Sequence, residues 1–329
     1  MSIQESPIIS MARATKIIRK SIHTFLQNYH YLTSIATFIA LPFSITLLIS
    51  QAIIPRSLTL LPTIYTRLNS VFDAAGFFQS SVFFSLVTQK LSQTISTWVL
   101  TLPFALSFLL LAKASIIPLF NTTAKNISFS KIYAVLLSTH LCNSLVIFAA
   151  NATCFSIFFL ALNFLQDFNI NSTNWMFSLT GFFAVFYSIV LANTLVVCNL
   201  ALIASALETH KSPGFQAILR ACLTIKGKTS TALALAVPIN LLLAAIEALF
   251  YYRIIKPNEN FIATDTQLWL IALEGVLIAY LFSIVLVIEV IMSCFFYQSC
   301  MNDLEFEIDE LWYYSDVNLE KLKDLDDFV

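Results

Sequence analysis

The fold is decided by residues Tyr187–Arg253, which read YSIVLANTLVVCNLALIASALETHKSPGFQAILRACLTIKGKTSTALALAVPINLLLAAIEALFYYR. Two apolar runs, Tyr187–Ala206 and Thr231–Tyr252, flank a short polar and basic segment. Each run has about the 20 residues that a helix needs to cross a bilayer. The segment between them is too polar to cross. The stretch therefore predicts two membrane spans joined by a surface helix.

The middle segment carries its own start and stop signals. Ser212 is a good N-cap, Pro213 suits the first helical position, and Gly227 suits a left-handed residue after the last turn. We therefore predict a helix over residues 213–226 that lies in the headgroup plane of the cytoplasmic leaflet. Its apolar side would hold Phe215, Ile218, Cys222 and Ile225. An ordinary loop helix packed on its neighbours is the alternative.

Composition sets the class of the protein. Of 329 residues, 58% are hydrophobic and 11% are charged, which an ordinary soluble domain does not show. Continuous apolar runs exclude the alternating pattern of a membrane β-barrel. We predict an all-α, polytopic transmembrane helix bundle with amphipathic interfacial helices and six spans, at Tyr31–Ile54, Thr97–Ile117, Tyr133–Leu165, Trp175–Ala206, Thr231–Tyr252 and Leu268–Tyr297.

The lysines and arginines orient these spans. If the N-terminus is inside, 13 of the 18 fall on the cytoplasmic side. We therefore expect both termini in the cytoplasm, in a multi-pass protein of the endomembranes or the plasma membrane.

The chain divides into a cytoplasmic N-terminal segment (1–30), a six-span domain (31–297) and an acidic cytoplasmic tail (298–329). Residues 8–30 predict a basic amphipathic helix, with Met11, Ile18, Ile22, Phe25 and Tyr29 opposite its cations. The basic residues expected to bind anionic headgroups are Arg13, Lys16, Lys20, Arg220, Lys226 and Lys228. A transit peptide is the rival interpretation of the N-terminus, but Glu5 and the absence of a clear cleavage signal count against it.

Residues 71–91 combine many phenylalanines with Ser, Gln and Thr. We expect an interfacial or re-entrant helix on the exoplasmic side, starting near Gly76. Pro42, Pro103 and Pro238 each remove a backbone hydrogen bond, which predicts kinks in three spans.

Ionisable and amide side chains inside the spans are functional candidates, because a charge at the bilayer centre costs at least about 2.5 kcal/mol. They are His140, Asn143, Asn193, Asn240, Glu247, Glu274 and Glu289. Converging groups would line the path of a proton-coupled carrier, whereas scattered ones would act as interhelical contacts. We predict one ion pair, between Lys113 and Glu289.

No motif predicts catalysis or a cofactor. The sequence has no Gly-rich phosphate loop, no nucleophile elbow and no His-Glu-x-x-His, and its six cysteines lack metal-site spacing. We expect no enzyme activity, metal, cofactor, disulfide or nucleic-acid partner. Cys294 and Cys300 are open to two interpretations, palmitoylation or burial as small hydrophobes.

The C-terminal tail is strongly acidic. Residues 301–329 carry a net charge of minus eight, which is typical of a solvated, partly disordered arm. Tyr314 and Val317 fit the Tyr-x-x-hydrophobic pattern that sorting adaptors bind. We predict a cytoplasmic protein partner here; a fold-back of the tail onto Arg220, Lys226 and Lys228 is the alternative.

Several short motifs are distinctive as a set. They are Thr101-Leu102-Pro103-Phe104-Ala105, Ala112-Lys113-Ala114-Ser115, Thr139-His140-Leu141-Cys142-Asn143-Ser144, Tyr187-Ser188-Ile189-Val190-Leu191-Ala192-Asn193, Cys198-Asn199-Leu200-Ala201 and Ile246-Glu247-Ala248-Leu249-Phe250. Over residues 40–256 the chain resembles a family of land-plant multi-span membrane proteins of unknown function. The resemblance implies a plant source and six spans, and implies no activity and no site residues.

Three functions follow as hypotheses. The first is a non-enzymatic membrane scaffold, trafficking or bilayer-organising factor that acts through lipid and protein contacts. The second is a carrier of a small solute that uses the buried His, Glu and Asn groups. The third, an intramembrane lipid-modifying enzyme, has no motif in its favour.

Overall fold

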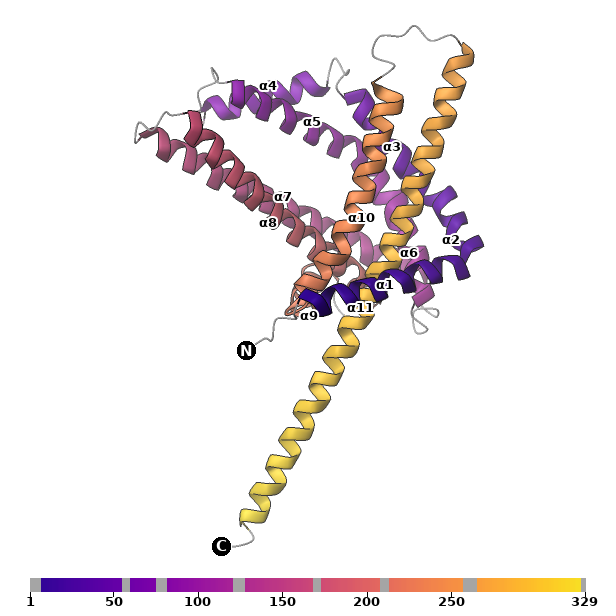
Figure 1. The fold of residues 1–329 in the computed structure, drawn as a ribbon, viewed down its shortest axis with the longest axis vertical. Helices are drawn as coiled ribbons and strands as arrows, with labels where there is room; N and C mark the ends of the chain where they lie inside the picture. The colour runs from indigo at the N-terminus through magenta and orange to yellow at the C-terminus, as the bar shows by residue number, and fades with distance from the viewer. Residues whose placement is uncertain are drawn as a thin grey trace. The chain divides into compact units, whose positions relative to one another are not determined.

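The structure, a computed structural model, describes residues 7–54, 60–74, 82–120, 128–167, 173–207, 213–256 and 265–326. These residues form helices and, within those ranges, no strand (Figure 1). The α-helices are α1 (Pro7–Gln27), α2 (Tyr29–Ile35), α3 (Leu41–Ile53), α4 (Leu60–Ala74), α5 (Val82–Phe104), α6 (Leu110–Ile116), α7 (Phe129–Asp167), α8 (Thr173–Leu207), α9 (Phe215–Ile225), α10 (Thr229–Phe250) and α11 (Asp265–Asp326).

Six helical segments are long and apolar enough to cross a membrane: Tyr29–Gln51, Thr88–Phe120, Phe129–Phe158, Gly181–Leu207, Thr229–Ile255 and Trp269–Asp303. The all-α class and the six candidate spans are therefore confirmed. Each segment overlaps one of the stretches that the sequence predicts, since run length and composition alone select them.

The chain forms two compact units. Unit 1 comprises Met1–Ile22, Phe120–Ala236 and Ile291–Val329, and unit 2 comprises His23–Leu119 and Val237–Val290. Helices α1, α10 and α11 therefore contribute residues to both.

In unit 1, α7 and α8 lie side by side, and α9 packs against both (Figure 1). The rings of Phe158 and Phe183 meet at 4.5 Å between centroids. Nearby, the Tyr187 hydroxyl donates to Asn151 Oδ1 at 2.9 Å. Aromatic packing and interhelical hydrogen bonds thus join two long helices that have no hydrophobic drive to associate in lipid.

In unit 2, α5 packs against α3 and α4. The Tyr31 hydroxyl donates to the Ser115 carbonyl at 2.9 Å, which joins α2 to α6. Two prolines lie beside π-helical turns: Pro42 follows Ala36–Ala40, and Pro103 precedes Ala105–Leu109. A proline that cannot donate to the carbonyl four residues back favours such a local change of hydrogen-bond spacing.

Residues 71–91, predicted as one interfacial or re-entrant helix, are described only in part, and that prediction stays a prediction. Residues 71–74 end α4, residues 82–91 begin α5, and Gly76 lies outside the described residues. Helix α5 can continue into a candidate span because its buried serine hydroxyls form hydrogen bonds with carbonyls of the same helix. Ser92 and Ser96 donate to the carbonyls of Gln89 and Ser92.

The surface helix begins two residues later than predicted. Helix α9 starts at Phe215, after Gly214 with φ +79°, so Pro213 is outside the helix. Ser212, the expected N-cap, lies outside the described residues. Gly227 has φ +85°, as a left-handed residue after the helix requires.

The tail, expected to be a solvated and partly disordered arm, has a helical backbone as far as residue 326. Helix α11 runs from Asp265 to Asp326 without a break, 62 residues in all, or about 93 Å at 1.5 Å per residue. The span supplies a formed helix, and extending a helix costs far less than nucleating one. Acidic residues therefore continue the helix that the apolar residues begin.

Candidate membrane-interface site

Helix α1 has three distinct faces. Ser10, Ala14, Ile17 and Ser21 are buried and recur at helical spacing, which defines the packed face. On one side of that face are exposed apolar side chains, with Met11 69% and Leu26 63% exposed. On the other side are Arg13, Lys16 and Lys20, with the exposed Ile9 among them. The packed face therefore separates an apolar edge from a basic edge.

This arrangement refines the predicted amphipathicity. The residues predicted on the apolar side differ in exposure, since Met11, Ile22 and Tyr29 are exposed and Phe25 is buried. Of the predicted headgroup-binding cations in α1, Lys16 is exposed. Lys20 is also exposed and sits over the Phe295 ring at 4.4 Å.

Helix α9 repeats the same three-face pattern. Ala217, Ile218, Ala221 and Ile225 are buried against the bundle. The exposed apolar edge on one side consists of Phe215, Leu219, Cys222 and Leu223. The opposite edge is polar and includes Gln216 and Arg220. The predicted apolar side is thus divided between the packed face and the exposed edge.

The packed face of α9 is held by a close contact with α7. The Gly214 amide donates to Thr139 Oγ1 at 3.1 Å. A Cβ at Gly214 would lie 3.3 Å from Cys142 Sγ, which is tighter than ordinary van der Waals contact. Glycine is required there both by its backbone conformation and by this approach.

One carboxylate of α11, that of Asp303, binds a residue of α1 and the residue just before α10. Asp303 Oδ2 accepts from Arg13 Nη1 at 2.7 Å and from Lys228 Nζ at 2.8 Å. Lys228 Nζ also donates to the Cys300 carbonyl at 3.4 Å. We call Arg13, Lys228 and Asp303 the Asp303 junction. Two of the predicted headgroup-binding cations are therefore ion-paired within the protein.

A second contact supports the junction, since Ser230 Oγ donates to Ser10 Oγ at 3.1 Å. Sequence reasoning missed Asp303 as a site residue because it counted the residue with the acidic tail. Its position in the sequence could have indicated the role, because Asp303 follows Cys300 by one helical turn and is the last residue of the sixth candidate span.

Amide side chains in the spans of unit 1 make interhelical hydrogen bonds. Asn143 is buried and its Nδ2 donates to the Cys198 carbonyl at 2.7 Å. Asn199 Nδ2 donates to Ser293 Oγ at 3.4 Å. His140 is half-buried and Asn193 is exposed. The first two contacts are those expected of amides that hold helices together.

The acidic candidates of unit 2 have separate surroundings. Glu274 Oε1 accepts from Arg253 Nε at 2.6 Å, and Glu247 Oε2 accepts from Gln51 Nε2 at 3.2 Å. Asn240 is exposed on α10. Lys113 is 8% exposed and Glu289 is half-buried, and their ion pair stays a prediction.

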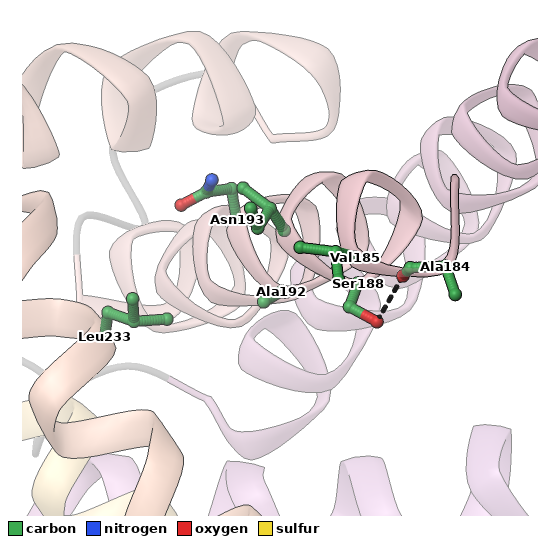
Figure 2. Close-up of a pocket in the computed structure, with 7 residues that line it drawn as sticks. Ala184, Val185, Ser188, Ala192, Asn193 and Leu233 are labelled. Atoms are coloured by element: carbon green, nitrogen blue, oxygen red, sulfur yellow. Dashed lines mark hydrogen bonds between the residues drawn. The ribbon is translucent and has the colours of Figure 1, made fainter. Parts of the chain in front are cut away.

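A shallow pocket of about 400 Å³ lies on unit 1 and is lined by Ala184, Val185, Ser188, Ile189, Ala192, Asn193 and Leu233. Its polar groups do not converge. Figure 2 shows the Ser188 hydroxyl bonded to the Ala184 carbonyl of its own helix, at 2.8 Å, with the Asn193 amide pointing elsewhere. Solute sites place several polar groups toward one ligand, and this apolar pocket does not.

The remaining predicted features are partly described. Cys294 and Cys300 are buried, which favours their interpretation as small hydrophobes. Tyr314 and Val317 belong to the helical backbone of α11, but their side chains lie outside the described set, so the sorting motif stays a prediction.

Over the residues that the structure describes, the fold is all-helical and has six helices that could cross a membrane, which indicates a multi-pass membrane protein. The chain belongs to the family of the domain of unknown function DUF8558, which matches residues 4–321. Comparison with curated proteins and with solved structures finds no match. The plant source implied by the resemblance stays a prediction.

Proposed function

We propose that this protein is a non-enzymatic membrane scaffold or bilayer-organising factor, and that α1 and α9 are its lipid-contacting elements. The supporting observation is that both helices expose an apolar edge on one side of the packed face and a polar or basic edge on the other. A helix at the headgroup boundary needs this division, because its apolar edge enters the acyl region while its cations stay among phosphates.

The orientation belongs to the same proposal. An even number of spans returns both ends of the chain to one side, and the excess of Lys and Arg assigns that side to the cytoplasm. The exposed cations Lys16, Lys20 and Lys226 would then face the anionic leaflet. The acidic helix beyond Asp303 would project from the same surface and bind a protein partner.

The interhelical amide contacts favour this function over a carrier. Asn143, Asn151 and Asn199 bond to groups on neighbouring helices. A carrier would instead aim such groups into a shared path. The mostly apolar lining of the pocket formed by α8 and Leu233 also favours a scaffold over a carrier.

Fluorescence depth measurement tests the proposal on the full chain in nanodiscs. The two native cysteines that are not buried, Cys142 and Cys222, would be replaced by serine. One cysteine at a time, introduced at Met11 or Lys16 of α1 or at Leu219 or Gln216 of α9, would then carry a small fluorophore. The labels at Met11 and Leu219 should be quenched by spin-labelled acyl chains. Those at Lys16 and Gln216 should be quenched by a water-soluble quencher. Equal access of water to all four labels would contradict the proposal.

Lipid composition supplies a second measurement. Replacing Lys16 and Lys226 with glutamine should lower the enrichment of phosphatidylserine around the reconstituted protein, at about 1 kcal/mol per cation near the surface. The matched control replaces Arg67 and Lys90, which are exposed on α4 and α5. An equal loss in the control would show that net charge alone causes the enrichment.

A further inference from the structure

Glu247 is a carboxylic acid inside a candidate span. It lies on α10, eight residues before the end of the span Thr229–Ile255, and is half-buried. Its Oε2 accepts from Gln51 Nε2, at the end of the first span, at 3.2 Å. Both residues belong to unit 2. The contact therefore joins the first and fifth spans through an acid and a neutral amide.

No cation among the described residues forms an ion pair with Glu247. Arg253 lies six residues further along, about 9 Å along the helix axis, and its Nε is bonded to Glu274 at 2.6 Å. Lys256 sits over the Tyr252 ring at 5.0 Å. Helix α3, which supplies Gln51, has no titratable residue.

The other ionisable groups of the surrounding helices are distributed as follows. Tyr251 is one turn after Glu247, at the start of the π-helical segment Tyr251–Ile255, and is half exposed. On α11, Glu289 lies 15 residues after Glu274, or about 22 Å along the axis. Tyr280 is half-buried on the same helix. Arg67, Asp73 and Lys90 of α4 and α5 are exposed.

An ionised carboxylate in this position is costly. A charged side chain costs at least about 2.5 kcal/mol at the bilayer centre on insertion scales, and simulations of an isolated helix give values several times larger. The single hydrogen bond that Glu247 accepts returns only about 1.5–3 kcal/mol, and no ion pair among the described residues adds to it. A neutral acid avoids the cost. It can also use both functions of the glutamine amide, because its O–H donates to the amide oxygen while its carbonyl accepts from the amide nitrogen.

We propose that Gln51 and Glu247 form an intramembrane proton-binding site, with a proton held on Glu247 at neutral pH. The site is independent of the surface helices and so goes beyond the scaffold function. Its ligand is a proton, bound between two spans by a carboxyl–amide pair. Raising the pH removes that proton and leaves a carboxylate with one amide donor.

Infrared spectroscopy of the full chain in proteoliposomes tests the site. At neutral pH, the difference between the wild-type protein and Glu247→Gln should contain the carbonyl band of a protonated carboxylic acid, and this band should disappear at alkaline pH. Gln51→Leu should shift the band, because the hydrogen bond to the carboxyl is lost. Glu274→Gln is the matched control and should remove carboxylate bands only. Carboxylate bands in the Glu247→Gln difference at neutral pH would overturn the proposal.

A second measurement uses the unmodified protein and so does not depend on how the variants fold. A hydrophobic carbodiimide reacts with protonated carboxyl groups within membranes, and peptide mass spectrometry locates the adduct. We expect modification of Glu247 at neutral pH and its loss at alkaline pH. An adduct on Glu247 that forms only in acid would refute a proton held at neutral pH.

Discussion

At the scale of single residues, Gly214 fixes the start of α9. Its φ of +79° with ψ of −128° is a conformation that residues with a Cβ rarely adopt, and an added Cβ would lie only 3.3 Å from Cys142 Sγ. The sequence predicts a helix over residues 213–226 that already includes this residue, whereas α9 begins after it. The sequence does not indicate that a glycine amide bonds Thr139 of another helix, because that contact requires the packing of α7.

Gly214→Ala should lower the free energy of unfolding by about 1–3 kcal/mol, the usual cost of a strained backbone residue. Thermal unfolding in detergent, followed by circular dichroism, measures the change. Gly181→Ala is the control, since Gly181 has a helical φ and nothing within 4 Å of an added Cβ. Equal stability of the two variants would contradict the assigned role of Gly214.

At the scale of helices, the three faces of α1 and α9 could be only partly predicted. Helical spacing in the sequence separates apolar from charged residues. It does not separate the apolar residues that pack on the bundle from those that stay exposed, such as Ile17 from Met11. Small residues provide a hint, because Ser10, Ala14 and Ser21 allow close approach between helices.

The Asp303 junction predicts how α1 is held. Asp303→Asn removes the negative charge that Arg13 and Lys228 share. At this partial exposure the ion pairs contribute about 1 kcal/mol, so their loss should make local opening of α1 roughly fivefold faster. Hydrogen–deuterium exchange should therefore accelerate in residues 10–21. Glu274→Gln breaks a different ion pair, in unit 2, and should leave α1 unchanged. An unchanged α1 in Asp303→Asn would show that its packed face alone holds the helix.

At the scale of the whole molecule, two truncations on either side of Asp303 can distinguish the role of the helical bundle from that of the tail. Deleting residues 304–329 keeps Asp303, so α1 should stay protected while the location or the partners of the protein change. Deleting residues 301–329 removes Asp303 as well and should also loosen α1. Hydrogen exchange and proximity labelling in cells distinguish the two effects. Identical behaviour of the two truncations would contradict this division.

Run length and composition determined the class of this protein by themselves, because hydrocarbon thickness sets how many apolar residues a span needs. They correctly indicated six candidate spans and a turn at Gly227. Only the tertiary structure decided that Asp303 joins Arg13 to Lys228 and that Gln51 meets Glu247. These partners are 290, 75 and 196 residues apart, and helical spacing carries no information on which faces of distant helices meet.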